Sequence, residues 1–186
     1  LRQAERDVVT VLLMPALGGP ERRIAQFYIR LAFDAPLTDL AWTPDGRFLL
    51  VCASQTREGR GELLRVSIET GEAKSIATAT DPMGYARFAL APDGRTLAIV
   101  RYPAAKPLEI VELSSSWDVV SARTLDAVDA VVRSLTWTAD SRELVYRIGV
   151  NAPAPLYRVS IDGGPGKPMS WVGPDADMPS IDPRGS

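Results

Sequence analysis

The amino-acid sequence predicts an all-β protein built from one repeated four-stranded antiparallel unit. Three observations lead to this prediction: a turn motif that returns at a regular spacing, an apolar run after each copy of the motif, and the lack of any sustained helical periodicity. The 186 residues are 46% hydrophobic and 24% charged, which is typical of an ordered chain. The repeat comes first in the argument because its period decides the fold class.

The turn motif marks each repeat. Its copies are Trp-Thr-Pro-Asp-Gly-Arg at 42–47, Leu-Ala-Pro-Asp-Gly-Arg at 90–95, Trp-Thr-Ala-Asp-Ser-Arg at 137–142, and a degenerate copy that starts at 181–186. A second marker is Val-Ser-Ile-Glu-Thr-Gly at 66–71 and Val-Ser-Ile-Asp-Gly-Gly at 159–164, with the aligned positions 111–116 between them and 14–19 before them. Two markers that share a period of about 45 to 50 residues indicate one supersecondary unit repeated along the chain.

The chemistry of the motif favours a tight hairpin turn. Pro44 presets the backbone at the second turn position, Asp45 can bond nearby backbone N–H groups, and Gly46 can take a positive φ. In the third copy Ser141 replaces the glycine, so that turn is expected to be strained or of another type. The repeating element is therefore a β-hairpin rather than a pair of helices.

Four strands can be assigned to each repeat. An apolar run follows each turn, at 48–53, 97–100 and 144–146, as in strands covered on both faces. The next strand alternates more clearly, at 63–68 and 156–161, and a shorter last strand follows, for example at 73–77. Four strands in up-and-down order make one blade of a β-propeller.

Counting strands predicts how the chain is divided. We expect a single β-propeller fragment over 1–186, incomplete, with about three full blades plus two partial ones. Its parts are a partial blade at 1–36, blades at 37–82, 83–130 and 131–174, and the start of another blade at 175–186. Residues 22–31 fit either a last strand with a loop or a short helix, and we favour the strand. The remaining blades are expected from sequence outside this chain.

The motif copies resemble the TolB-type, WD-like propeller repeats of bacteria over nearly the whole chain. A finer resemblance lies at 13–23 and 157–164, which are similar to blade endings in large winged-helix transcriptional regulators and in some membrane-linked serine/threonine kinases. In those families the propeller follows a transmembrane helix and senses or binds partners outside the cytoplasm. The resemblance thus implies an extracytoplasmic, periplasmic-side region of a bacterial membrane protein.

The composition excludes several kinds of chemistry within this chain. It has no histidine, which rules out a Ser-His-Asp triad and histidine-based zinc sites. The lone Cys52 rules out Cys-x-x-Cys sites, and no Gly-x-Ser-x-Gly elbow is present. A net charge of -2 argues against nucleic-acid binding by this segment, and no apolar run is long enough for a membrane span. We expect no catalytic, cofactor-binding or metal-binding residues here.

Acidic residues and tryptophans remain as candidates. The pairs Asp175/Asp177 and Asp126/Asp129 could bind a cation or transfer protons, but polar loops explain them better. Trp42 and Trp137 share one repeat position, with Leu90 and Ile181 at the equivalent places, which predicts a packing slot. Trp117 and Trp171 lie outside the motif, near turns. If exposed, they are candidate partner contacts, because tryptophan is enriched in interfaces.

Two functions remain open, and a third is disfavoured. The favoured one is a non-catalytic scaffold for protein–protein or ligand recognition, the sensory or interaction region of a larger bacterial regulator or kinase. The alternative is the substrate-gating propeller of a prolyl-oligopeptidase-like serine peptidase, with its nucleophile in another domain. A lyase or sugar-processing propeller is disfavoured because such sites use histidine or metal ligands.

Overall fold

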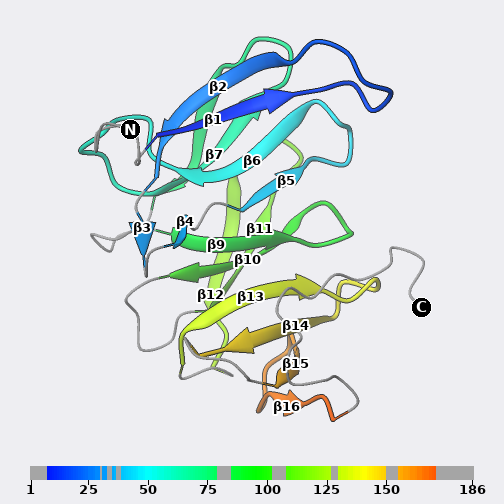
Figure 1. Ribbon diagram of the computed structural model, residues 1–186. Coiled ribbons are helices and arrows are strands. Elements are labelled where there is room, and N and C mark those ends of the chain that lie inside the picture. Colours follow the sequence, from blue (N-terminus) through cyan, green and yellow to red (C-terminus); the bar gives the residue numbers. More distant parts are fainter. Residues whose placement is uncertain are drawn as a thin grey trace. The chain divides into compact units, whose positions relative to one another are not determined.

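The computed structural model describes residues 8–29, 31–32, 35–36, 39–78, 85–101, 108–126, 130–149 and 155–170, and every regular element in these ranges is a β-strand (Figure 1). The chain forms two compact units, 1–86 and 87–186, and each is described by itself. The all-β prediction is confirmed, whereas the division into blades at fixed boundaries stays a prediction.

The first unit contains a two-stranded sheet, a short hairpin and a four-stranded sheet. Its strands are β1 (Val8–Leu13), β2 (Arg22–Tyr28), β3 (Leu31–Ala32), β4 (Ala35–Pro36), β5 (Leu40–Trp42), β6 (Phe48–Ala53), β7 (Glu62–Ser67) and β8 (Ala73–Thr78). The sheet orders are β1-β2, β3-β4 and β5-β6-β7-β8, so each strand pairs with its neighbour in sequence. The prediction of a strand within residues 22–31 is confirmed by β2.

The second unit contains two four-stranded sheets. Its strands, the first of which begins just before the boundary, are β9 (Tyr85–Leu90), β10 (Thr96–Arg101), β11 (Leu108–Leu113), β12 (Val119–Thr124), β13 (Val132–Trp137), β14 (Glu143–Ile148), β15 (Leu156–Ser160) and β16 (Lys167–Pro168). Both sheets again follow the order of the sequence. Four antiparallel strands in this order are the predicted repeat unit.

The repeated turn forms as its residues predict. The N–H of Gly46 donates to the carbonyl of Thr43 over 2.8 Å, and Gly46 has φ 65°. The Asp45 carboxylate accepts from the Thr43 hydroxyl at 2.5 Å and from the Arg47 N–H at 3.1 Å. A side chain that bonds its neighbouring backbone in this way stabilises the turn through contacts that are local in sequence.

The third copy of the turn keeps this geometry despite its serine. The N–H of Ser141 donates to the carbonyl of Thr138 over 2.9 Å, and Ser141 has φ 60°. A residue with a Cβ pays about 1 to 2 kcal/mol for this left-handed conformation. The sequence predicted either a strained turn or a turn of another type. The structure shows the same turn type, with backbone strain at Ser141.

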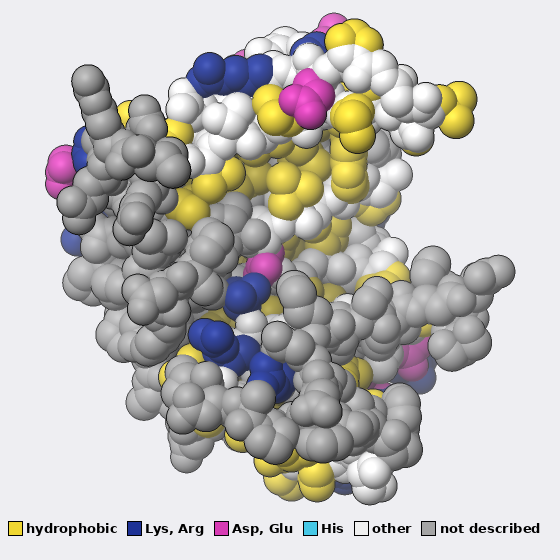
Figure 2. Space-filling model, in the orientation of Figure 1, with side chains coloured by type: hydrophobic (Ala, Val, Ile, Leu, Met, Phe, Trp, Pro, Cys, Tyr) yellow, Lys and Arg dark blue, Asp and Glu magenta, His cyan; other side chains and the backbone are white. Residues whose placement is uncertain are grey.

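Each unit has its own hydrophobic core between two sheets. In the first unit the core joins the β1-β2 sheet to β6 and β7; its buried residues are Val11, Ile24, Phe27, Ile29, Leu49, Val51, Ala53, Leu64 and Val66. In the second unit a core lies between the sheets β9–β12 and β13–β16. Hydrophobic side chains also gather on the visible face of the first unit, over the region of β5 and β6 (Figure 2).

Arginines on the outer strands add polar contacts between the two sheets of each unit. Arg22 on β2 donates from Nη2 to the carbonyl of Ile68 over 2.6 Å. In the second unit, Arg123 on β12 donates from Nη2 to the carbonyl of Ile161 over 2.6 Å. Both acceptors lie in the turn that follows the third strand of the next sheet, so each arginine helps to position that turn.

Candidate functional site

The first and third turns of every four-stranded sheet lie at the same end of that sheet, because consecutive strands run in opposite directions. We call this end the turn end. Its residues are 43–47 and 67–72 in the first unit, and 91–95, 114–118, 138–142 and 160–164 in the second. The two turns of a sheet are joined by a backbone hydrogen bond, such as that from Ile68 N–H to the Arg47 carbonyl at 3.0 Å.

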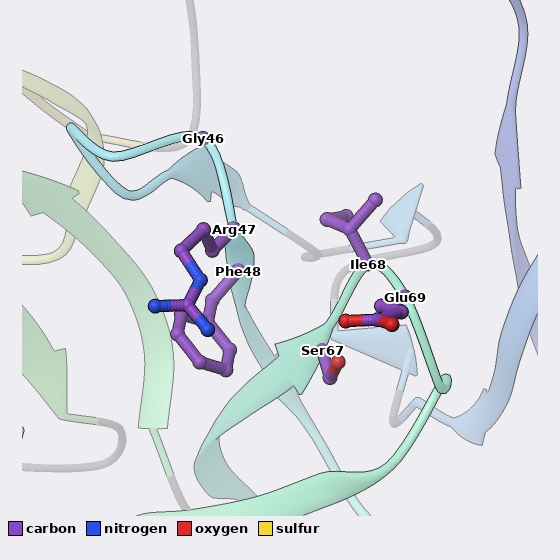
Figure 3. A pocket seen from close by; sticks show the side chains of 6 residues that line it. All are labelled: Gly46, Arg47, Phe48, Ser67, Ile68 and Glu69. Carbon is purple, nitrogen blue, oxygen red and sulfur yellow. The ribbon is translucent and has the colours of Figure 1, made fainter.

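A shallow hollow of about 240 Å³ lies at the turn end of the first unit, lined by Gly46, Arg47, Phe48, Ser67, Ile68 and Glu69 (Figure 3). The guanidinium of Arg47 lies 5.8 Å from the centroid of the Phe48 ring, and that of Arg65 lies 4.5 Å from it. Pockets for small molecules usually measure about 300 to 1,000 Å³. The hollow is therefore smaller than a typical small-molecule pocket.

The turn aspartates carry the lowered pKa values of this region. The Thr43 hydroxyl and then the Arg47 N–H lower the pKa of Asp45 from its ordinary value, and Thr138 and Arg142 do the same for Asp140. Burial raises the pKa of Asp93, but its bonds from Thr96 and Arg95 outweigh this effect and the pKa is lowered. These carboxylates are therefore fixed acceptors within turns and are unsuited to proton transfer near neutral pH.

The lowered pKa of Asp45 gives a testable pH dependence. Because the folded-state pKa lies below the unfolded value of 3.8, the ionised carboxylate stabilises the fold above that value, and this contribution is lost as the pH falls through the folded-state pKa. We expect Asp45→Asn to lower the melting temperature more at pH 7 than at about pH 2. Thermal unfolding followed by circular dichroism at both pH values tests this. An equal loss at both would contradict it.

Trp117, one of the two predicted contact residues, lies in the turn between β11 and β12. Its backbone has φ 69°, its side chain is half-buried, and its N–H donates to the Ser114 carbonyl over 3.0 Å. The corresponding turns of the other two four-stranded sheets place Gly71 and Gly163 at positive φ. A tryptophan in this conformation costs about 1 to 2 kcal/mol relative to an ordinary backbone. Trp171, the other predicted contact, lies outside the described residues.

Polar groups hold the Trp117 turn in place. The Ser114 hydroxyl accepts from the N–H groups of Ser116 and Asp118, each at 3.2 Å. The Ser116 hydroxyl donates to the Asp118 carboxylate over 2.6 Å. The turn is thus internally bonded, and these bonds offset part of the backbone strain at Trp117.

The strand after this turn exposes apolar side chains that the sequence prediction missed. All six residues of β12 are exposed, including Val119 at 41% and Val120 at 65%. In the described part of the chain β12 pairs only with β11, and its register shifts at Val120. A signal was present in the sequence. The last strands β2 and β16 begin with Arg22 and Lys167, and β8 has Lys74 at its second position, whereas β12 begins with two valines.

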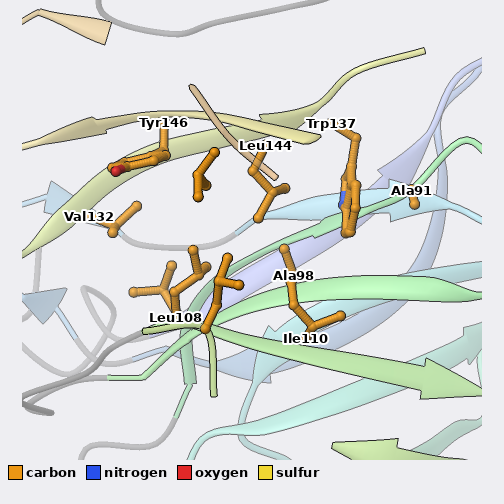
Figure 4. Packing of buried hydrophobic residues seen from close by; sticks show 11 residues of the cluster. Ala91, Ala98, Leu108, Ile110, Val132, Trp137, Leu144 and Tyr146 are labelled. Atoms are coloured by element: carbon orange, nitrogen blue, oxygen red, sulfur yellow. The ribbon is translucent and has the colours of Figure 1, made fainter. Parts of the chain in front are cut away.

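Of the two tryptophans predicted to fill a buried packing position, only Trp137 does so. Trp137 is 3% exposed, and its indole Nε1 donates to the carbonyl of Ala89 over 2.9 Å (Figure 4). Trp42, at the same place in the motif, is 47% exposed. The expectation that both residues fill a slot is therefore wrong for Trp42, because a slot needs a neighbouring strand over the ring.

The other candidates do not form a catalytic or metal site within the described residues. Asp126 is exposed, Asp129, Asp175 and Asp177 fall outside those residues, and no group of three or more potential ligands occurs among the side chains described. Burial raises the pKa of the Cys52 thiol well above its ordinary value, which disfavours the thiolate that reacts or binds metal. None of the described elements is a helix that could cross a membrane.

The sheets define the class of the molecule. Four-stranded antiparallel sheets in sequential order, each with the same first turn, are β-propeller blades. No family model matches the sequence, and no curated protein matches it.

Solved structures show which β-propellers this chain is similar to. TolB from Acinetobacter baumannii matches with a TM-score of 0.60 at 18% identity, over 95% of this chain and 41% of that chain. A putative TolB from Agrobacterium tumefaciens gives 0.58 at 19% identity, over 89% and 55%, and hydrazine synthase from Kuenenia stuttgartiensis gives 0.59 at 15%, over 98% and 55%. The chain has a TolB-like β-propeller fold, and it spans about half the length of these structures.

Proposed function

We propose that this chain is part of a non-catalytic β-propeller scaffold that binds a protein partner through Trp117 and the exposed strand β12. The observation that carries the proposal is the half-buried Trp117, held at φ 69° where other blades have glycine. Strained backbone is retained mainly where it serves function, and tryptophan is enriched among residues that dominate binding energy. Val119 and Val120 extend the apolar surface along β12, which among the described strands pairs only with β11.

The chemistry of the partner follows from this surface. Within the described part of the chain, one edge of β12 pairs with no strand and offers backbone N–H and carbonyl groups to an added strand, and the exposed valines offer apolar contact. The edge is only six residues long and is interrupted at Val120, so it favours a short extended segment. The partner is therefore expected to contribute a short apolar strand to β12 and a small pocket or flat apolar patch to Trp117.

The proposed setting is the sensory or interaction region of a larger bacterial regulator or kinase, on the extracytoplasmic side of the membrane. The resemblance of residues 13–23 and 157–164 to blade endings of such proteins supports this setting. A non-catalytic role is supported by the complete lack of histidine in the chain. Hydrolysis of a proline-containing peptide by the full-length protein would instead favour the substrate-gating propeller of a peptidase.

Site-specific photo-cross-linking in the full-length protein, expressed in its own host cell, tests the proposed surface. With p-benzoylphenylalanine in place of Val120 we expect one discrete cross-linked adduct, and Trp117→Ser should remove it while leaving the melting temperature within about 2 °C. The matched control places the same group at Leu17, a fully exposed apolar residue of the first unit. Equal cross-linking at the two positions, or none at Val120, would contradict the proposal.

A further inference from the structure

Two residues at the turn end of the second unit have a left-handed backbone although neither is glycine. Among the described non-glycine residues, only Trp117 (φ 69°) and Ser141 (φ 60°) have a positive φ. Trp117 lies in the turn between β11 and β12, and Ser141 lies in the turn between β13 and β14. Strained backbone persists where the surrounding structure holds it, and it often clusters at functional sites. The strain of the second unit is thus concentrated at one end of two sheets.

The Ser141 side chain makes a contact that glycine could not make. Its hydroxyl oxygen accepts a hydrogen bond from the backbone N–H of Asp93 over 3.1 Å. Asp93 belongs to the first turn of the other sheet of this unit, 48 residues earlier in the chain. At the same motif position the other two turns have Gly46 and Gly94, which have no side chain to offer. Serine suits the backbone conformation less well than glycine, but it adds a bond between two sheets.

The Asp93 turn is in turn bonded to the turn that carries Trp117. The Asp93 carboxylate accepts from the N–H of Arg95 over 2.7 Å, which closes the turn on itself. The carbonyl of Arg95 accepts from the N–H of Leu113 over 2.9 Å, directly before the turn at 114–118. A continuous path of hydrogen bonds therefore runs from Ser141 to the Trp117 turn.

A second path joins the same two turns through β12. Arg123 on β12 donates from Nη2 to the carbonyl of Ile161 over 2.6 Å. The N–H of Ile161 donates to the carbonyl of Arg142, the residue after Ser141, over 3.0 Å. The two paths together link the four turns of the turn end in a closed circuit. In this circuit the Ser141 hydroxyl makes the direct bond to Asp93 between the first turns of the two sheets.

The balance of energies indicates that Ser141 acts on geometry more than on stability. A residue with a Cβ in the left-handed conformation carries a strain of about the same size as the net gain from one hydrogen bond. Serine at this position therefore brings little net stability to the fold. What it changes is the freedom of the first turn of one sheet to move relative to the first turn of the other.

We propose that Ser141 is a positioning residue for the partner-binding surface at Trp117. Its hydroxyl ties the turns of two sheets together, and the resulting circuit holds the Trp117 turn in the conformation that meets the partner. The role of Trp117 in binding is taken from the proposed function, on which this part of the proposal rests. The positioning of its turn by Ser141 depends on the hydrogen bonds alone and can be measured without a partner.

Removal of the hydroxyl in Ser141→Gly tests this role in the full-length protein. Glycine relieves the strain at φ 60° while the bond is lost, so we expect the melting temperature to change by less than about 2 °C. The Asp93 amide should exchange with solvent about fivefold faster, because it loses its acceptor. The Gly94 amide, bonded to the Ala91 carbonyl within the same turn, should keep its rate. Hydrogen exchange at residue resolution measures both amides.

The conformation of Trp117 is read by labelling with 5-fluorotryptophan, and its fluorine resonance is assigned by its loss in Trp117→Phe. We expect Ser141→Gly to shift or broaden this resonance and to leave that of Trp42, in the first unit, unchanged. The yield of the cross-link from Val120 should fall severalfold. The matched control is Arg142→Ala, which removes an exposed side chain from the same turn and keeps the backbone carbonyl of the circuit. It should leave all of these readouts unchanged.

The possible results separate the two proposals. An unchanged Asp93 exchange rate, or a faster rate with an unchanged Trp117 resonance, overturns the positioning role, since Ser141 then acts at most on its own turn. A melting temperature that falls beyond the stated limit assigns Ser141 to general stability and also overturns it. A changed Trp117 resonance with undiminished cross-linking from Val120 supports the positioning of the turn by Ser141 and contradicts the proposed binding surface instead.

Discussion

Replacing Trp137 with alanine is expected to lower the free energy of unfolding by about 3 to 5 kcal/mol, as is typical for truncation of a buried aromatic side chain. The indole is 3% exposed and lies in the core of the second unit with Ala98, Leu144 and Val159. The variant also leaves the Ala89 carbonyl without its indole donor, which adds a penalty of about 1 kcal/mol. Urea denaturation followed by circular dichroism measures the change.

The matched control for this experiment is Trp42→Ala. This variant removes the same side chain from the same motif position, but the side chain is 47% exposed and buries far less apolar surface. Its effect is expected to stay below about 1 kcal/mol, because large losses require burial. Similar losses for the two variants would mean that Trp42 is covered in solution and would contradict the structural difference between the two positions.

Truncation of Leu64 is expected to cost the first unit about 2 to 5 kcal/mol of its stability. Leu64 is fully buried on β7, in the core that joins this strand to Val11 and Phe27 of the β1-β2 sheet. Leu64→Ala removes these contacts and leaves a cavity between two sheets that cannot close without moving backbone. The loss is a large part of the 5 to 15 kcal/mol that typically stabilises a domain, so the unfolding midpoint should fall sharply.

Leu12→Ala supplies the contrast. Leu12 lies in the β1-β2 sheet, next to Val11 in sequence but on the opposite face of β1. The Leu12 side chain is 51% exposed on β1, and its loss should cost below about 1 kcal/mol. A double variant of Leu64 and Phe27 should cost less than the sum of the two single changes, because both side chains line the same core. If Leu12→Ala proved as damaging as Leu64→Ala, the outward face of β1 would be covered in solution.

The turns show how much of the local conformation can be predicted from neighbouring residues. Thr43, Asp45 and Gly46 form the predicted hairpin turn, and their hydrogen bonds join residues within the six-residue segment 43–48. The conformation of Ser141 was not decided by the sequence, since strain and a different turn type were both possible. In the structure Ser141 has the left-handed conformation, in the turn between the paired strands β13 and β14. The sheet thus decided a local conformation that the residue alone disfavours.

At the candidate site, the sequence did not predict the backbone conformation or the exposure of the side chains. Trp117 could be singled out as a contact residue, but its positive φ depends on a network of serine and aspartate bonds within the turn. The exposure of Val119 and Val120 was not predicted, although paired valines would fit either an edge or a core strand. Whether a strand lies at the edge of a sheet depends on whether a second strand pairs with it, and its own residues do not decide this.

The sequence by itself determined the all-β class, the repeat and the chemistry of the turns, because these depend on neighbouring residues and on a period visible in one chain. Only the tertiary structure decided which side chains are buried, as the contrast between Trp42 and Trp137 makes plain. The two positions are alike in sequence and differ in what lies over them. The physical reason is that burial is a property of two surfaces in contact, and each motif encodes only one of them.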